Sequence, residues 1–213
     1  MLSNIIAVTL PLIISIFSFL FLFWRRTKED YPSNDIFEVA SLMLILSSFV
    51  SGLVLFIQLK IDSFPQISVS SILFWCFAVV SVLVILFFSK KKQMSFIELL
   101  DSSIFSYLLA FFVIVSSHAL YTKNSKSLIL ATIIGFIFIL YIFFDERYKS
   151  FTWYKSGKVG FSGLFSAGVF FVTRAILAIS FKSMTTIIGP IDVLLSALVA
   201  FAFFLMLYNI ATK

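Results

Sequence analysis

The sequence predicts an all-α integral membrane protein, a polytopic bundle of about seven transmembrane helices. Of its 213 residues, 61% are hydrophobic and only 12% are charged, and the mean hydropathy is +1.12. A soluble domain has about 25% charged residues. The apolar residues also gather in runs of about 20, the length that a helix needs to cross a bilayer. We therefore treat residues 1–213 as a single integral membrane domain.

Seven apolar runs are expected to form the spans. The first run is followed by the basic residues Arg25, Arg26 and Lys28 and has no basic segment before it. We therefore expect a retained first span and not a cleaved signal peptide. The longest connection, residues 145–158, mixes charged and aromatic residues. The expected spans are residues 2–24, 36–59, 67–89, 102–121, 127–144, 159–181 and 187–210.

The basic residues between the runs predict the orientation, because Lys and Arg collect in the cytoplasmic loops of membrane proteins. Eleven of them follow the first, third, fifth or seventh span, and four follow the others. We expect the N terminus outside and the C terminus in the cytoplasm. Their place in short loops also argues against nucleic-acid binding, despite a net charge of +6. The first group is Arg25, Arg26, Lys28, Lys90, Lys91, Lys92, Arg147, Lys149, Lys155, Lys158 and Lys213, and the second is Lys60, Lys123, Lys126 and Lys182.

Arg174 is the leading candidate for a functional residue, because it lies well inside the span 159–181. At mid-membrane an arginine costs about 2.5–3.5 kcal/mol on translocon scales, so such residues normally face a bundle interior or a wet cavity and have a partner. Gly160, Gly163 and Ala167 share its helical face, whereas large apolar residues cover the opposite face. The small-residue face predicts packing against protein.

Asp192 is the partner that we expect for Arg174. With the predicted orientation, Arg174 lies in the outer half of its span, and Asp192 lies about one turn inside the next span. Asp192, Ser196 and Ala200 recur at helical spacing and predict a seam that faces the preceding span. Two interpretations stay open: a functional arginine with its partner, or a structural clamp that neutralises two charges.

His118, near the outer end of the fourth span, can reach the same layer. It is a candidate catalytic base, and the alternative is an ordinary hydrogen-bonded or hydrated histidine. Trp75 is interpreted as a packing residue or an interfacial anchor, and Cys76 as a small buried hydrophobe. Glu98 and Asp101 are interpreted as acids that favour the dipole at a helix start, without a catalytic role.

Metal and redox chemistry are not expected. The single cysteine excludes an intrachain disulfide, and the single histidine excludes a multi-histidine metal site. The motifs CxxC, HExxH and GxSxG and the P-loop are all absent. We therefore expect neither a metal nor another cofactor.

Several segments, in this order, resemble those of one family of membrane enzymes. They are Phe23–Arg26, Asn34–Glu38, the basic turn Lys90–Met94, Ser95–Asp101, and Gly160–Phe165 leading to Arg174. In these segments the chain is similar to the prolipoprotein diacylglyceryl transferases of bacterial plasma membranes. Seven spans with the N terminus outside agree with that family.

The resemblance implies a function at the outer leaflet of a bacterial plasma membrane. The family moves a diacylglyceryl group from phosphatidylglycerol to the thiol of a lipobox cysteine in a prolipoprotein. By this resemblance Arg174, whose expected partner is Asp192, would bind the lipid phosphate and stabilise the departing glycerol phosphate. In that family a histidine serves as the base toward the thiol, but the carry-over works well for Arg174 only. The implied partners are phosphatidylglycerol and a lipobox peptide.

The chain departs from the family at several polar motifs. The family's His-Gly-Gly motif falls near Trp75–Phe77, where there is neither a histidine nor a glycine pair. Its Arg-x-Gly-Asn signature falls near residues 115–123, which are Val-Ser-Ser-His-Ala-Leu-Tyr-Thr-Lys. Its His-Pro-x-Gln-Leu-Tyr-Glu segment is absent, and Ala178 stands where an acid is expected. His118 matches the family in depth but not in motif position.

Three hypotheses follow. In the first, the chain is a divergent transferase in which His118 replaces the lost base. In the second, it is a degenerate relative that keeps the bundle and the lipid contact of Arg174 without transfer chemistry. Loss of several polar groups that act as one unit favours the second. In the third, it is an unrelated small transporter or membrane scaffold subunit, which lacks support because the sequence shows no Gly/Pro-broken helix pair and no multi-charge pathway.

Overall fold

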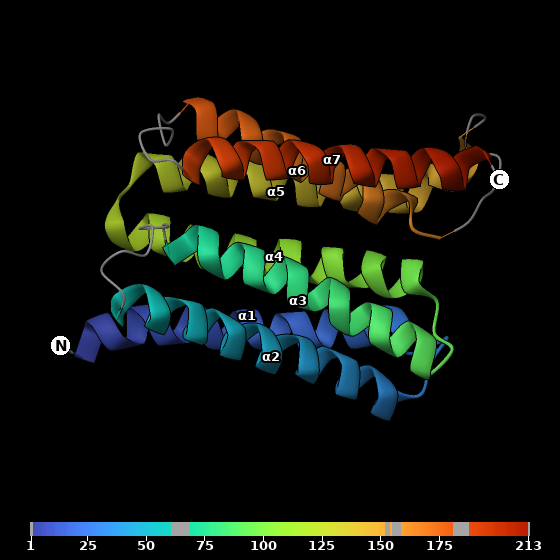
Figure 1. Cartoon of the computed structure of the whole chain (residues 1–213), viewed down its shortest axis with the longest axis horizontal. Coiled ribbons are helices and arrows are strands. Elements are labelled where there is room, and N and C mark those ends of the chain that lie inside the picture. Colours follow the sequence, from blue (N-terminus) through green and yellow to red (C-terminus); the bar gives the residue numbers. More distant parts are fainter. Residues whose placement is uncertain (1, 61–68, 152–153, 155–158, 181–187, 213) are drawn as a thin grey trace.

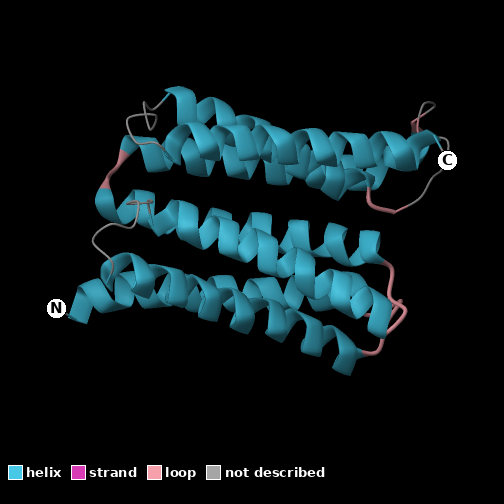
Figure 2. Ribbon diagram, viewed as in Figure 1, coloured by secondary structure: helices cyan, strands magenta, loops and turns pink. Residues whose placement is uncertain are grey.

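The computed structural model describes residues 2–60, 69–151, 154, 159–180 and 188–212. These residues form seven α-helices and one short 3₁₀ helix, and no strand occurs among them (Figure 2). All seven α-helices are long and apolar enough to cross a membrane, which confirms the predicted fold class. They are α1 (Leu2–Thr27), α2 (Ser33–Lys60), α3 (Val69–Lys91), α4 (Phe96–Thr122), α5 (Ser125–Arg147), α6 (Phe161–Ser180) and α7 (Ile188–Thr212), with the 3₁₀ helix η1 (Tyr148–Ser150) after α5.

Most helices extend beyond the predicted spans. α4 begins at Phe96 instead of residue 102, and α5 ends at Arg147 instead of residue 144. Asp145 therefore lies in a helix and not in the connection predicted for 145–158. Apolar runs mark only the part of a helix that lies in hydrocarbon, whereas capping groups determine where its backbone ends. The predicted span limits at 67, 181 and 187 lie outside the described residues.

Successive helices run in opposite directions (Figure 1). Each end of the bundle therefore contains the last turns of one set of helices and the first turns of the other. α1, α3, α5 and α7 end at the right of the figure, where α2, α4 and α6 begin. We call this the Arg26 end, because Arg26 lies in the last turn of α1. The opposite end is called the Arg174 end, because Arg174 lies in the second half of α6.

α4 lies at the centre of the arrangement. It packs against α1, α3, α5 and α6, whereas α2 packs mainly on α3, and α7 on α6. Ten of its side chains are buried, among them three serines and Asp101 at its start. α4 can therefore bring polar groups of several helices together at the Arg26 end.

The outer surface suits lipid. Phe17, Phe49, Phe136 and Phe201, from α1, α2, α5 and α7, each expose between 60% and 68% of their surface. Exposure of so many large apolar side chains is unfavourable in water and normal in hydrocarbon. The helices also satisfy their own backbone hydrogen bonds, which a membrane requires.

Candidate functional site

The start of α4 follows from the capping motif Ser95-Phe96-Ile97-Glu98. Ser95 has an extended backbone (φ −67°, ψ 118°), and its hydroxyl accepts a hydrogen bond from the Glu98 N–H at 3.4 Å. Such a cap satisfies one of the N–H groups that a helix start leaves without an intrahelical partner. Asp101 consequently lies inside the helix, in its second turn. It is 3% exposed.

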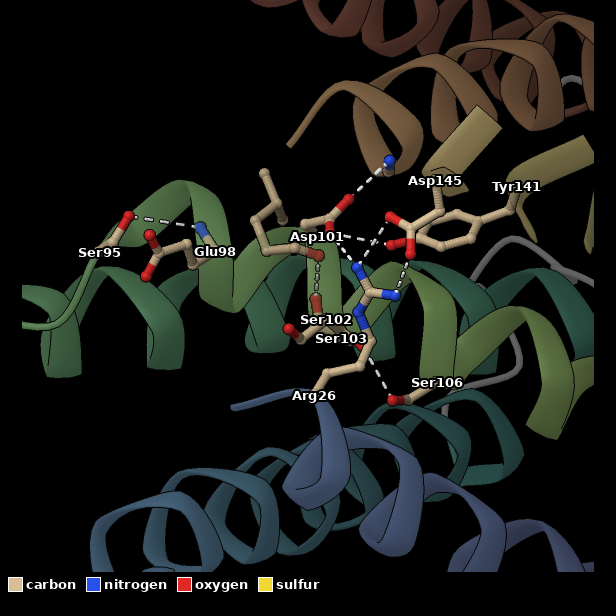
Figure 3. Close-up of polar contacts among 11 residues, drawn as sticks. Arg26, Ser95, Glu98, Asp101, Ser102, Ser103, Ser106, Tyr141 and Asp145 are labelled. Carbon is tan, nitrogen blue, oxygen red and sulfur yellow. Dashed lines mark hydrogen bonds and ion pairs between the residues drawn. The ribbon is translucent and has the colours of Figure 1, made fainter. Parts of the chain in front are cut away.

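The Asp101 carboxylate joins four helices (Figure 3). Its Oδ1 accepts a hydrogen bond from the Gly163 N–H of α6 at 2.6 Å. Its Oδ2 accepts from Arg26 Nη2 of α1 at 2.8 Å and from the Tyr141 hydroxyl of α5 at 2.9 Å. A buried carboxylate is tolerated only with partners of this kind. We call Arg26, Asp101, Tyr141, Asp145 and Gly163 the Arg26 cluster.

Arg26 extends the cluster to Asp145, near the end of α5. Its Nη1 lies 2.9 Å from Asp145 Oδ2, and its Nη2 lies 3.1 Å from Asp145 Oδ1, so the contact is bidentate. The guanidinium also lies over the rings of Phe105 and Tyr141, with its Cζ 5.0 and 5.2 Å from their centroids. These contacts add cation–π attraction. One guanidinium therefore serves two carboxylates and two rings.

Two glycines allow this close approach of α4 and α6. A Cβ atom on Gly163 would lie 2.3 Å from Asp101 Oδ1 and 2.9 Å from Asp101 Cα. Gly160, just before α6, has a φ of +110°, and a Cβ there would lie 2.3 Å from Ile97 Cγ2. The small-residue face of this span thus packs on protein, as predicted. Its two glycines make room for Asp101 and Ile97 in the first turns of α4.

Two interpretations from the sequence need correction. Arg26 was counted among the loop charges, but it lies in α1 and is held by two carboxylates. Asp101 was interpreted as an acid that favours the dipole of its own helix. Its carboxylate instead contacts the first turn of α6, where the partial positive charge of that helix favours an anion.

Tyr31, in the connection between α1 and α2, lies beside the start of α4. Its hydroxyl donates to Glu98 Oε2 at 2.5 Å and accepts from the Ser95 N–H at 2.9 Å. Burial and, next, the hydrogen bond to Glu98 raise the pKa of Tyr31 to about 12. The uncharged Tyr31 hydroxyl therefore links this connection to the start of α4 by two hydrogen bonds.

At the Arg174 end, the predicted contact between Arg174 and Asp192 is present. Arg174 Nη2 lies 3.0 Å from both Asp192 oxygens, and the two side chains are 19% and 15% exposed. The Trp75 indole N–H of α3 also donates to Asp192 Oδ1. The guanidinium lies over the Phe74 ring, 4.2 Å from its centroid. Helices α3, α6 and α7 therefore meet at this pair.

Arg174 also borders a small apolar cleft between α4, α5 and α6. The cleft has a volume of about 100 Å³. Arg174 and Thr173 are its polar lining residues, and the others are Phe111, Leu130, Ile133, Ile134, Phe170 and Leu177. This combination places a cation beside a surface suited to hydrocarbon.

His118 lies away from these groups. It is exposed near the end of α4, and its Nδ1 lies 3.2 Å from Ser127 Oγ. Within the described part of the chain, no contact joins it to Arg174 or Asp192, and it does not line the cleft. Its role as a base stays a prediction.

Sequence reasoning missed Tyr141, Asp145 and Trp75 as polar partners. The Ser-x-x-Glu pattern at 95–98 is typical of a helix N-terminus and could have been used to predict that the fourth helix begins at Phe96. Asp101 would then have been expected inside that helix. For Tyr141 and Trp75 no comparable local signal exists. Their partners, Asp101 and Asp192, lie 40 and 117 residues away along the chain.

The seven apolar helices and their lipid-suited surface define a multi-pass integral membrane protein. Comparisons of the chain with protein-family models, with curated proteins and with solved structures give no significant match. Arguments about its function therefore rest on its own residues.

Proposed function

We propose that the chain is a phospholipid-binding protein of the bacterial plasma membrane. In this proposal it has the architecture of the prolipoprotein diacylglyceryl transferases, and Arg174 holds the phosphate of phosphatidylglycerol. The observation that carries it is that Arg174 lines an apolar cleft. A phospholipid presents the same combination, a phosphate joined to hydrocarbon.

The geometry of Arg174 favours recognition of an oxyanion. Asp192 and the Phe74 ring hold the guanidinium in one orientation, so less conformational entropy is lost when a ligand binds. Arginine can contact two phosphate oxygens at once, which lysine cannot. The lipid phosphate would share the guanidinium with Asp192 or replace that carboxylate.

The size of the cleft limits what it can hold. Sites that enclose a whole small-molecule ligand have volumes of about 300–1,000 Å³. A cleft of about 100 Å³ admits only a short part of a lipid. The rest of an acyl chain would lie along the exposed apolar faces of α5 and α6.

Three of the segments on which the resemblance rests meet in the Arg26 cluster. Three of the resembling segments, Phe23–Arg26, Ser95–Asp101 and Gly160–Phe165, contribute one residue each to it: Arg26, Asp101 and Gly163. These three segments are distant in sequence, and their contacts hold α1, α4 and α6 together. The contacts therefore concern the stability of the bundle and not the transfer reaction.

Transfer chemistry is not part of the proposal. A base toward a thiol must lie within hydrogen-bonding reach of the group that it deprotonates. His118 contacts Ser127 and not the Arg174–Asp192 pair. We therefore favour lipid binding with lost or altered catalysis over active transfer.

The test measures bound lipid on the intact protein. Wild type, Arg174→Ala, Arg174→Lys and the control Arg147→Ala are purified alike, and co-purified phosphatidylglycerol is measured by native mass spectrometry. Arg147 is exposed at the other end of the bundle. We expect about tenfold or greater loss for Arg174→Ala, since a charged hydrogen bond contributes about 1.5–3 kcal/mol. Arg174→Lys should restore part of it, and Arg147→Ala should bind like wild type.

Equal phosphatidylglycerol in wild type and Arg174→Ala would refute the proposal. A second assay offers labelled phosphatidylglycerol and a lipobox peptide to the same preparations. Transfer by wild type that disappears in Arg174→Ala would establish the divergent transferase instead. Binding without transfer is the expected result.

A further inference from the structure

A second cleft, at the Arg26 end, is lined by carboxylates and lies apart from the lipid site proposed at Arg174. Its volume is about 100 Å³, and it lies between the end of α1, the α1–α2 connection and the start of α4. The lining residues that matter here are Arg26, Asp30, Tyr31, Glu98, Asp101 and Ser102. Glu98, Asp101 and Ser102 occupy one helical face at spacings of three and four.

Among the residues that the structure describes, the charges that face this cleft do not cancel. Asp101 is compensated by Arg26, by the Tyr141 hydroxyl and by the Gly163 N–H, and Asp145 shares the same guanidinium. Glu98 accepts one hydrogen bond from Tyr31, a neutral group. Asp30 is exposed and lines the cleft, and neither it nor Glu98 forms an ion pair within the described residues. The dipole of α4 contributes only about half a positive charge.

Ser102 supplies an independent observation. It is only 4% exposed, yet it lines the cleft. Its carbonyl accepts from Ser106, whereas its hydroxyl has no hydrogen-bond partner in the part of the chain that the structure describes. A hydroxyl that lines a cleft and makes no hydrogen bond to the described residues can accept one from a ligand with N–H donors.

We propose that this cleft binds a primary ammonium group. Such a group offers three N–H donors, which match the Glu98 carboxylate, the Asp30 carboxylate and the Ser102 hydroxyl oxygen. A quaternary ammonium has the same charge but no donor, so it would leave Ser102 unsatisfied. In the described residues no group of three or more His, Cys, Asp or Glu side chains could hold a metal ion.

Two sources could supply this chemistry: the headgroup of an aminophospholipid and a soluble amine. The cleft lies at the Arg26 end of the bundle, beside the end of α1 and the start of α4, which is the level of the lipid headgroups. The proposal is the same for both sources, since each presents a primary ammonium. The experiment distinguishes between them.

The test uses the full chain in nanodiscs of phosphatidylcholine and phosphatidylglycerol. Melting temperature is measured against ethanolamine, with choline at equal ionic strength as the matched control. In a second arm, phosphatidylethanolamine replaces phosphatidylcholine. We expect ethanolamine to raise the melting temperature saturably and choline to have no such effect. Phosphatidylethanolamine should raise it further if the lipid headgroup is the natural ligand.

Variants link the effect to the cleft. Glu98→Gln and Asp30→Asn should each weaken the apparent ethanolamine affinity by about tenfold, as expected for one lost charged hydrogen bond. Glu146→Gln, an exposed change on α5 at the same end, should respond like wild type. Equal responses to ethanolamine and choline, or an undiminished response in Asp30→Asn, would overturn the inference. Lipid binding at Arg174 is measured separately and does not depend on this result.

Discussion

At the scale of single residues, Asp101 and Gly163 show how closely packed helices determine side-chain identity. The Asp101 carboxylate lies 2.6 Å from the Gly163 N–H, a distance that leaves no room for a side chain at 163. The N–H that it satisfies belongs to the first turn of α6. One carboxylate therefore serves both as an ion-pair partner and as a cap for another helix.

Gly163→Ala should destabilise the bundle. Its Cβ would lie 2.3 Å from Asp101 Oδ1, so either the carboxylate or the helix must move. We expect a loss of about 1–3 kcal/mol in the free energy of unfolding, the range for overpacking. Reversible unfolding in mixed detergent micelles measures it. The control is Gly52→Ala, where the added Cβ meets nothing within 4 Å. If both variants melt alike, the contact does not constrain residue 163.

The raised pKa of Tyr31 predicts that its contribution to stability depends on pH. Its pKa in the folded protein is about 12, above the ordinary value of 10.0. A group whose pKa is raised on folding contributes stability that is complete below the unfolded pKa and is lost as the pH rises through the folded pKa. Tyr31→Phe should therefore lower the melting temperature at about pH 8, and this difference should shrink between pH 10 and 12.

Tyr121→Phe is the control for that experiment, because Tyr121 is exposed at the other end of the bundle. Its melting temperature should match that of wild type at every pH. A Tyr31→Phe difference that stays constant up to pH 12 would contradict the assignment of this titration to the Tyr31 hydroxyl.

At the scale of elements, the Arg174–Asp192 pair connects α6 to α7, and Trp75 connects α3 to both. Each group has part of its hydrogen-bonding capacity satisfied by the others. In hydrocarbon an isolated charge is costly, so removal of one partner leaves a penalty that removal of both does not. The pair is therefore expected to couple the two helices energetically.

A double-mutant cycle tests this coupling. Asp192→Asn and Arg174→Gln should each destabilise the protein in detergent, and the double variant should be less destabilised than the sum of the two. We expect a coupling of about 1–3 kcal/mol, typical of charged groups in direct contact. Thermal unfolding of the four proteins measures it. Strictly additive losses would show that the contact contributes no net coupling.

At the scale of the whole molecule, the distribution of basic residues predicts how the bundle inserts. Exposed Lys and Arg side chains gather at the Arg26 end, on the last turns of α1, α3 and α5. Cytoplasmic loops attract such residues, so the Arg26 end should face the cytoplasm. The helical bundle itself is compatible with either orientation.

Cysteine accessibility measures the orientation. In a Cys76→Ser background, Lys123→Cys at the Arg174 end should react with a membrane-impermeant maleimide in intact cells. Lys91→Cys at the Arg26 end should react only after permeabilisation. Both lysines are exposed, so each label reports the side of the membrane and not burial. The opposite pattern would invert the predicted topology.

Much of the fold could be predicted from the sequence, because apolar runs are a local property. The seven helices occur where the runs predict them, although their ends differ by up to two turns. The contact between Arg174 and Asp192 could be predicted for a related reason, since charges inside spans need partners and few candidates exist.

The Arg26 cluster and the position of His118 could not be predicted in this way. Arg26, Asp101, Tyr141 and Gly163 come from four helices, and their meeting depends on how each helix is rotated and which helices are neighbours. Hydropathy records neither property. The small-residue face of α6 indicated that it packs on protein, but not that its partner is the start of α4.

The membrane class, the number of spans and the need for a partner at Arg174 follow from the sequence, because each depends on what hydrocarbon tolerates at a given position along one chain. The tertiary structure decided the rest: it brought Asp101 to the first turn of α6, Trp75 to Asp192, and Glu98, Asp30 and Ser102 around one cleft. These contacts join residues that are far apart in sequence, so they exist only once the helices have packed.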